Sequence, residues 1–322
     1  MSYNVENLFD DVDNGSEFRE FDPGRGAWST ELFQVRVDTI AEVVRKSVAG
    51  GPDVLLLQEV ENENALEVLV RKGLRGMGYR DLVIVPKKRL AASIGIVSRL
   101  PIARVRTHAV GPWNGDPVRD ILEVEIEMSG HTLHLFNNHW KSKTGGTKAT
   151  EPSRLESSGA VARRIREILA QDPAADIVLA GDMNENLDEY ALIGRKYQTA
   201  LLPAMEKVSA EFERQSLFLA GNARQPGIAG DRVTLYEPWF ELPGERRGSY
   251  VYQGDWQTMD HLLLSAGLLD SQGFSYRWGS FSVVTLPFLL TEKGVPRKWA
   301  GLAGTRGYSD HLPLLITLEL RK

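Results

Sequence analysis

Four short polar clusters stand at the ends of apolar stretches, and each carries side chains that can bind a cation or move a proton. In chain order they are Asn4-Val5-Glu6, Gln58-Glu59, Gly181-Asp182-Met183-Asn184 and Ser309-Asp310-His311. Carboxylate and amide oxygens suit hard divalent cations, and a histidine beside an aspartate can act as a general base or an electrostatic clamp. Together the clusters indicate a metal-assisted reaction with proton transfer.

Each cluster also has an ordinary structural explanation. Side chains alternate along a strand, so Asn4 and Glu6 are expected to share one face, but a strand ending in a polar turn would look the same. Glu59 could simply favour the N-terminus of a following helix. Asp182 and Asn184 are typical of Asx turns. The order of the clusters along the chain, more than any one of them, favours a catalytic site.

Two further stretches add to this set. Asp260 stands before an apolar run and could orient His311 from across the site. The stretch 137–143 ends a predicted strand at His139 and opens the most basic loop of the chain, which could hold a phosphate or a nucleic-acid backbone or could be an ordinary solvated loop. The candidate phosphate contacts are Asn138, Lys141, Arg119 and Arg154.

The apolar pattern predicts the elements that must position these residues. A 3.6-residue period predicts helices over 30–48 and 153–170, and 62–76 is expected to be a third helix. Continuous apolar runs at 53–58 and 176–180 predict buried strands. Further strands are expected at 1–5, 79–85, 91–98, 102–110, 119–128, 131–138, 259–265, 274–285 and 311–319. The stretch 205–250 is rich in loops.

This mixture of helices and mostly sequential strands predicts an α/β fold with two packed sheets and helices outside them. The chain has 322 residues, no internal repeat and no low-complexity linker, so we expect a single domain over 1–322. We also expect a monomer. A strand at the first residue is unusual for a natural start, so we expect that the chain was trimmed at its N-terminus. The compartment stays open, and a secreted or periplasmic protein that has lost an export signal is one alternative.

Composition excludes several classes of chemistry. The chain has no cysteine, which rules out thiol nucleophiles, cysteine zinc sites and disulfides. Its formal net charge is −5, so any groove for nucleic acid must be a local feature. No apolar run approaches the ~18 residues of a membrane span. A Walker loop, a His-x-x-x-His zinc helix and a Gly-x-Ser-x-Gly elbow are all missing from the sequence.

The motifs resemble those of the endonuclease/exonuclease/phosphatase superfamily, which includes DNase I-like nucleases, abasic-site endonucleases, inositol polyphosphate phosphatases and bacterial sphingomyelinases. The matching segments are SYNVENLFD (2–10), DVLLLQEVEN (53–62), GIVSRLPI (95–102), FNNHWKSK (136–143), VLAGDMNE (178–185), TMDHLLLS (258–265) and YSDHLPL (308–314). They span the chain, and the resemblance implies a four-layered DNase I-like α/β sandwich of two mixed β-sheets flanked by helices.

The resemblance also implies roles for the candidate residues. The metal site would be formed by Asn4, Glu6, Glu59 and Asp310. The catalytic residues would be Asp182, Asn184, His139, His311 and Asp260. Asp182 would activate the attacking water, Asn184 would hold the scissile phosphate, and Asp260 would pair with the terminal histidine. The implied cofactor is Mg²⁺, with Mn²⁺ or Ca²⁺ as alternatives.

We therefore expect a Mg²⁺-dependent hydrolase of phosphate esters, and in the first place a nuclease or phosphodiesterase that cleaves nucleic acid. The alternatives are a phosphatase or phosphodiesterase for a small or lipid-derived ester, such as an inositol phosphate or a sphingomyelin-like lipid, and a non-catalytic scaffold with the same fold. Aromatic side chains between 236 and 256 could stack on bases, although core packing is their commoner use. These are Tyr236, Trp239, Phe240, Tyr250, Tyr252 and Trp256.

Overall fold

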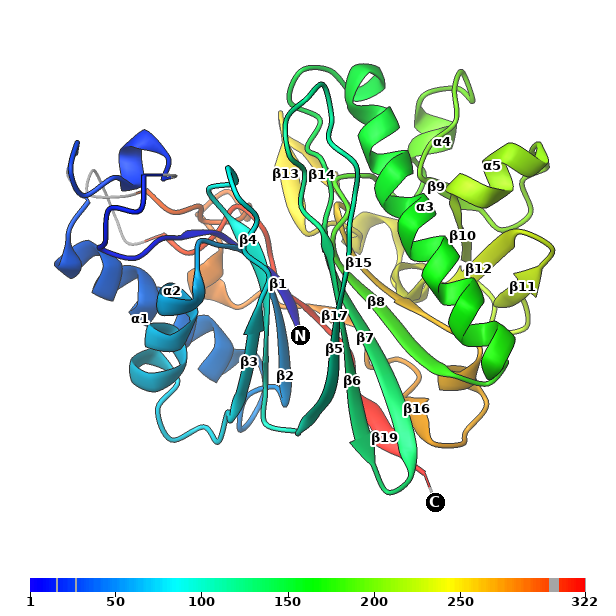
Figure 1. The fold of residues 1–322 in the computed structure, drawn as a ribbon, viewed down its shortest axis with the longest axis horizontal. Coiled ribbons are helices and arrows are strands. Elements are labelled where there is room, and N and C mark those ends of the chain that lie inside the picture. Colours follow the sequence, from blue (N-terminus) through cyan, green and yellow to red (C-terminus); the bar gives the residue numbers. More distant parts are fainter. Residues whose placement is uncertain (16, 27, 301–306, 322) are drawn as a thin grey trace.

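The computed structural model describes residues 1–15, 17–26, 28–300 and 307–321. Two mixed β-sheets pack against each other, and helices cover their outer faces (Figure 1). The predicted four-layered α/β sandwich is thereby confirmed. Two strands near the end of the chain, at 282–283 and 314–315, return to the first sheet, which supports one domain over 1–322; the domain count stays a prediction.

The first sheet has the strand order β17-β18-β1-β2-β4-β3, with β1 and β2 parallel. Its strands are β1 (Ser2–Leu8), β2 (Val54–Val60), β3 (Asp81–Ile84), β4 (Ser93–Ser98), β17 (Ser282–Val283) and β18 (Leu314–Leu315). Helices α1 (Thr30–Ser47) and α2 (Glu63–Val68) lie on its outer side (Figure 1). Ser29 caps α1 by accepting a hydrogen bond from the Leu32 amide, and the apolar side chains Val37, Ile40 and Val44 are buried.

The second sheet has the order β5-β6-β7-β8-β15-β12-β10-β9, and β11 pairs with β12. Its strands are β5 (Ile102–His108), β6 (Ile121–Met128), β7 (His131–His139), β8 (Asp176–Asp182), β9 (Leu201–Pro203), β10 (Leu217–Ala220), β11 (Gly227–Ala229), β12 (Arg232–Tyr236) and β15 (Asp260–Leu264). The long helix α3 (Thr147–Gln171) crosses its outer side (Figure 1), followed by the short helices α4 (Glu189–Leu192) and α5 (Ala210–Gln215).

Two small antiparallel pairs complete the strands: β13 (Tyr250–Tyr252) with β14 (Asp255–Gln257), and β16 (Phe274–Tyr276) with β19 (Leu318–Leu320). The 3-10 turns are Arg19–Phe21, Pro238–Glu241, Gly244–Arg246, Gly267–Leu269 and Pro287–Leu289. Within the described part of the chain, no helix is both long and apolar enough to cross a membrane.

The structure differs from the predicted elements where segments are short. The stretch 205–250, expected to be rich in loops, contains three strands of the second sheet, because runs of three to five residues are too short to show a period. The helix predicted at 62–76 is α-helical only over Glu63–Val68 and continues as a π turn over Leu69–Gly73. Helix α3 begins at Thr147 and runs through Pro152, although proline is normally confined to the first turn of a helix.

Strand β1 is interrupted where its polar cluster lies. Its register with β2 shifts between Asn4 and Leu8, and Glu6 and Asn7 adopt φ values of 50° and 69°. Glu59, on the facing strand, has a φ of 65°. The regular alternation that placed Asn4 and Glu6 on one face therefore does not hold, because a bulge re-aims the side chains at this point.

A pair of buried amides joins the two sheets directly below these clusters. Gln58 of β2 donates from Nε2 to Asn137 Oδ1 at 2.6 Å. Asn137 of β7 in turn donates to the carbonyl oxygens of Leu57 (3.0 Å) and Gly95 (2.8 Å) in the first sheet. Both amide side chains are fully buried. This amide pair therefore sets how the two sheets are placed relative to each other.

Asn137→Leu should destabilise the protein by about 3 kcal/mol, because it leaves buried polar partners without a hydrogen bond. Urea denaturation followed by circular dichroism measures the change. Gln171→Leu removes an exposed amide at the end of α3 and should change the stability by less than about 0.5 kcal/mol. Equal midpoints for Asn137→Leu and the wild type would contradict a structural role for the amide pair.

Candidate active site

The residues predicted to carry the chemistry gather at one end of the two sheets. Strands β1 and β2 are parallel in one sheet, and β7 and β8 are parallel in the other, so their carboxyl ends meet at the same edge. In the second sheet Asp182 lies in register between two neighbours, with His139 on one side and Asp260 on the other. Three of the predicted catalytic side chains are thus adjacent in one ladder.

Asn4 links the two sheets across this edge. Its Nδ2 donates to Glu59 Oε1 at 3.2 Å and to Asp182 Oδ2 at 3.0 Å. The Nε2 atom of His139 lies 3.4 Å from Asp182 Oδ2 and 3.9 Å from Glu59 Oε1. Asp182 is also held by the backbone amide of Asn184, which donates to Oδ1 at 2.9 Å. These residues come from four strands and form one compact polar centre.

His311 enters this centre from the far end of the chain. Its Nδ1 lies 2.7 Å from Asp260 Oδ2, and its Nε2 lies 3.9 Å from Asp182 Oδ2. Burial alone would lower the pKa of His311, but the charges of Asp260 and Asp182 raise that pKa well above its ordinary value. His311 therefore carries a proton at neutral pH and presents a positive charge beside Asp182.

His139 has the opposite electrostatic character. Burial lowers its pKa well below the ordinary value, and the positive charges of Arg119, His311 and Lys141 lower it further. The imidazole is therefore neutral at neutral pH. Its buried Nδ1 has no hydrogen-bond partner within the residues that the structure describes. The two histidines can accordingly play different parts, one as a cation and the other as a neutral donor or acceptor.

The carboxylates of the site are crowded. Burial raises the pKa of Asp182 to about 7 and, with the nearby charge of Asp310, raises the pKa of Glu6 to about 7. Burial also raises the pKa of Glu59, although the charge of Arg119 opposes the shift. Such shifts mean that the chain's own cations do not offset the cost of burying these acids as anions. Hard oxygen ligands with unbalanced negative charge are a fitting environment for Mg²⁺.

Glu59, Asp310 and Asn4 are the residues that could hold such an ion. Glu6 differs from them because its Oε2 already accepts hydrogen bonds from the backbone amides of Trp299 (2.6 Å) and Asp310 (2.9 Å). Glu6 therefore positions the segment that carries Asp310, and its role as a metal ligand stays a prediction.

Arg119 and Lys141, two of the four candidate phosphate contacts, lie next to this centre. Both line a cavity of about 250 Å³ that also reaches His139. The Lys141 ammonium lies 5.0 Å from the ring centroid of Trp113, another wall of the cavity. Positive charge gathers at this cavity: burial lowers the pKa of Lys141, and the charges of Arg119 and Arg154 lower it further, whereas Asp116, also in the cavity wall, opposes the shift.

The other two candidates, Asn138 and Arg154, are not brought to the site. Asn138 is fully buried, donates to the Ala180 carbonyl at 3.1 Å and accepts from the Trp140 indole at 3.1 Å. Arg154 is fully buried as well. In this structure neither side chain is accessible to a phosphate, which corrects the expectation that both contact a substrate phosphate. Strand alternation explains Asn138, because its neighbours Asn137 and His139 point toward the first sheet and Asn138 therefore points away from it.

Arg154 is fully buried in a charge network that holds the basic loop in place. Its guanidinium pairs with Glu151 at 2.5 Å and with Glu185 at 3.4 Å. It also donates to the carbonyl oxygens of Lys141 (3.0 Å) and Thr147 (2.9 Å). Glu185 directly follows Asn184, so Arg154 ties the loop after β7 to the turn after β8.

Two contacts at the site were not foreseen from the sequence. Ser249 donates from Oγ to Asp260 Oδ2 at 2.5 Å. The ring of Tyr250 stacks on His311, with centroids 4.7 Å apart and an angle of 30° between the planes. Both residues lie at the end of the stretch expected to be loop-rich, where no periodic signal could place them.

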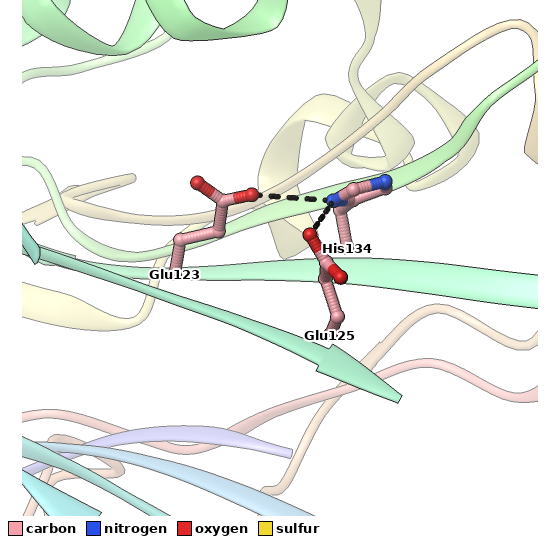
Figure 2. Close-up of side chains that lie close together, drawn as sticks. All are labelled: Glu123, Glu125 and His134. Atoms are coloured by element: carbon pink, nitrogen blue, oxygen red, sulfur yellow. Dashed lines mark hydrogen bonds and ion pairs between the residues drawn. The ribbon is translucent and has the colours of Figure 1, made fainter. Parts of the chain in front are cut away.

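A second group of acidic and histidine side chains lies elsewhere, on β6 and β7. In Figure 2 the carboxylates of Glu123 and Glu125 both point to the ring of His134. The His134 Nδ1 atom lies 3.2 Å from Glu123 Oε1 and 3.8 Å from Glu125 Oε1. Arg164 of α3 pairs with Glu123 at 2.8 Å, and Arg104 of β5 pairs with Glu125 at 3.2 Å. These carboxylates are already balanced by guanidinium groups, so the cluster is an ion-pair network between neighbouring elements and not a metal site.

The chain belongs to the Endonuclease/Exonuclease/phosphatase family, whose sequence model matches residues 1–207 and 205–320. Members of this family are metal-dependent phosphoesterases. A 5′-tyrosyl-DNA phosphodiesterase from Caenorhabditis elegans is 25% identical over 166 residues, which cover 49% of this chain and 40% of that relative. The match thus spans less than half of the relative's length.

Solved structures share the fold. TDP2 from D. rerio, crystallised with a single-strand DNA product, is 16% identical with a TM-score of 0.50, covering 83% of this chain and 86% of that one. Beta toxin from Staphylococcus aureus is 15% identical with a TM-score of 0.55 and 98% coverage of both chains. A mannosyl-6-phosphatase from Bacteroides thetaiotaomicron is 18% identical with a TM-score of 0.55, covering 99% and 98%. At these identities the likeness shows the fold alone.

Arg154→Met should destabilise the protein by about 3–5 kcal/mol, because Glu151 and Glu185 would lose their buried cation. Thermal denaturation measures the loss. Arg163→Met, which changes an exposed arginine on the same helix, is the matched control and should have little effect. A variant of Arg154 with wild-type stability but weaker phosphate binding would instead restore its role as a phosphate contact.

Proposed function

We propose that this chain is a Mg²⁺-dependent hydrolase that cleaves phosphodiester bonds of nucleic acid. The observation that carries the proposal is the meeting of Glu59, Asp182 and His311 in one centre, although they are far apart along the chain. These three supply a metal ligand, a base and a cationic clamp. Each of these functions lowers the barrier to hydrolysis of a phosphate ester when it acts at the same phosphorus atom.

On the metal side, Glu59 and Asp310 would hold the ion together with Asn4. When bound there, a divalent ion supplies Lewis acidity to a phosphoryl oxygen and stabilises negative charge. The crowding of carboxylates described above supports this assignment, because a divalent cation would balance charges that the chain itself leaves unbalanced.

On the proton side, Asp182 is the base. Hydrogen bonds from Asn4 and from the Asn184 backbone orient its carboxylate, so it is ready to take the proton of an attacking water. His311, kept protonated by Asp260, stabilises charge on a phosphoryl oxygen through Nε2. His139, which is neutral, can donate a hydrogen bond from Nε2 to a second oxygen.

The positive cavity beside the catalytic centre favours nucleic acid as the substrate. Arg119 and Lys141 extend positive charge beyond the scissile phosphate, as contacts to a further backbone phosphate would require. This is the local basic feature that a chain with a net charge of −5 needs to bind a polyanion.

A phosphatase for a small ester is the second candidate, because a cavity of about 250 Å³ could also receive one small phosphorylated molecule. A panel of plasmid DNA, RNA, inositol phosphates, sphingomyelin and bis-p-nitrophenyl phosphate, each with Mg²⁺ or EDTA, separates the two. Nicked plasmid at low enzyme concentration supports the nuclease. Intact DNA with rapid phosphate release from a small ester supports the phosphatase, and no hydrolysis at all supports a binding scaffold.

Mg²⁺ should raise the thermal midpoint of the wild-type protein, because an ion that binds only the folded state stabilises it. Glu59→Gln should abolish most of this rise, and in EDTA it should be at least as stable as the wild type because it relieves carboxylate crowding. Differential scanning fluorimetry in about 10 mM Mg²⁺, a concentration chosen to saturate the site, or in about 10 mM EDTA measures both effects. Glu127→Gln removes an exposed carboxylate of β6 and should keep the Mg²⁺ response, whereas a full response in Glu59→Gln would refute the metal assignment.

Asp182→Ala and His311→Ala should each lower turnover by about 10²–10⁴-fold, the usual worth of a general base or a charge-stabilising donor. Initial rates with bis-p-nitrophenyl phosphate and with plasmid DNA measure the loss. Asp188→Ala, an exposed aspartate six residues further on, should keep near-wild-type rates. Near-full turnover in either active-site variant would remove that residue from the mechanism.

A further inference from the structure

The hairpin of β13 and β14 is attached directly to the catalytic centre. Ser249, at its base, donates a hydrogen bond to Asp260, and its carbonyl accepts from the Leu312 amide at 2.7 Å. Tyr250 pairs with His311 through the backbone and stacks on its ring. In Figure 1 the hairpin is the yellow pair of strands above β15. It therefore forms a wall of the site and not a remote loop.

The two faces of this hairpin differ. The register pairs Tyr250 with Gln257, Val251 with Trp256, and Tyr252 with Asp255. Because side chains alternate, Tyr250 and Tyr252 share one face, and Trp256 lies on the other. Trp256 packs on its own base, since its ring leaves no room for a Cβ on Gly248. Tyr252 is 53% exposed, so the tyrosine face continues from the site into solvent.

This face forms an aromatic row that starts at the reacting groups. Tyr250 is close to the catalytic acids: burial raises its pKa, and the charges of Asp310 and Asp182 are the next largest causes. Tyr252 follows two residues along the strand, an advance of about 6.6 Å. Stacked bases of one strand in a duplex are only about 3.4 Å apart. Within a duplex both faces of a base are covered by its stacked neighbours, so a base can lie on the Tyr252 ring only where at least one of its faces is free of a neighbouring base.

We infer that the Tyr250–Tyr252 face is a stacking platform for an unpaired nucleobase next to the scissile phosphate. The inference rests on the proposed function and narrows its substrate to single-stranded or locally opened nucleic acid. The two flanks of the centre are complementary for such a strand. The cavity with Arg119 and Lys141 offers charge for phosphates, and the tyrosine face offers flat rings for bases, a combination typical of proteins that bind single strands.

Binding to a catalytically inactive background tests the platform. The protein carries Asp182→Asn, the probe is fluorescein-labelled oligothymidylate of twelve nucleotides, and fluorescence anisotropy in Mg²⁺ gives the Kd. Tyr252→Ala should raise the Kd by about 5- to 100-fold, as expected for the loss of one base–aromatic stack. Tyr252→Phe keeps the ring and should stay within about 2-fold. An abasic spacer at the one position whose base stacks on Tyr252 should raise the Kd of the parent protein as Tyr252→Ala does. With that probe, Tyr252→Ala should cause no further rise in the Kd.

Trp256→Ala is the matched control because it removes an aromatic ring of the same hairpin from the opposite face. It should leave the Kd within about 2-fold. The thermal midpoint of each variant shows whether the hairpin still folds, and Tyr252→Phe separates ring loss from misfolding. The inference is overturned if Tyr252→Ala binds like its parent, if Trp256→Ala weakens binding equally, or if annealing a complementary strand tightens binding.

The assay distinguishes this inference from the proposed function. Ring-dependent binding without hydrolysis by the wild-type protein would refute the nuclease and leave the platform. Hydrolysis of DNA with no dependence on Tyr252 would refute the platform and leave the nuclease. A p-nitrophenyl ester of thymidine 5′-phosphate tests whether the ring instead holds an aromatic leaving group. If Tyr252→Ala impairs only this substrate, the platform for a nucleobase is refuted.

Discussion

The amide pair of Gln58 and Asn137 is the constraint on which the site depends. It is a buried polar link between two sheets whose contact beneath the catalytic centre is mostly apolar, and apolar contacts do not specify a register as strictly as hydrogen bonds do. Gln58 directly precedes Glu59, and Asn137 stands two residues before His139. The same hydrogen bond that locks the sheets therefore places the metal-side carboxylate opposite the histidine and Asp182.

Electrostatics then give chemically similar residues different roles. His311, paired with Asp260, is held cationic, whereas His139, buried beside positive groups, is held neutral. Asp182 and Glu59 both lie in a crowded acidic centre, but only Asp182 is oriented by the amide of a tight turn. Burial sharpens these differences, since interactions between charges are stronger where water is excluded. The centre can thus offer a base, a cationic clamp and metal ligands within a few ångströms.

The fold alone leaves the substrate open, because the same architecture occurs in TDP2, in beta toxin and in a mannosyl-6-phosphatase. What is particular to this chain lies beside the shared centre. On one side is the positive cavity with Lys141 and Trp113, and on the other is the hairpin with Tyr250 and Tyr252. Both flanks are built from loops and short strands, where substrate preference can change without disturbing the sheets.

The sequence by itself determined the fold class, the main helices and buried strands, and the clusters around Glu59, Asp182 and His311, because apolar periodicity and polar residues at strand ends are local signals. Only the tertiary structure decided which polar residues face the site. It buries Arg154 in an ion pair with Glu151, and it engages the Glu6 carboxylate in hydrogen bonds from backbone amides. It also brought Ser249 and Tyr250 to the catalytic pair. These outcomes depend on contacts between distant segments and on bulges that break strand alternation, neither of which leaves a local pattern in the sequence.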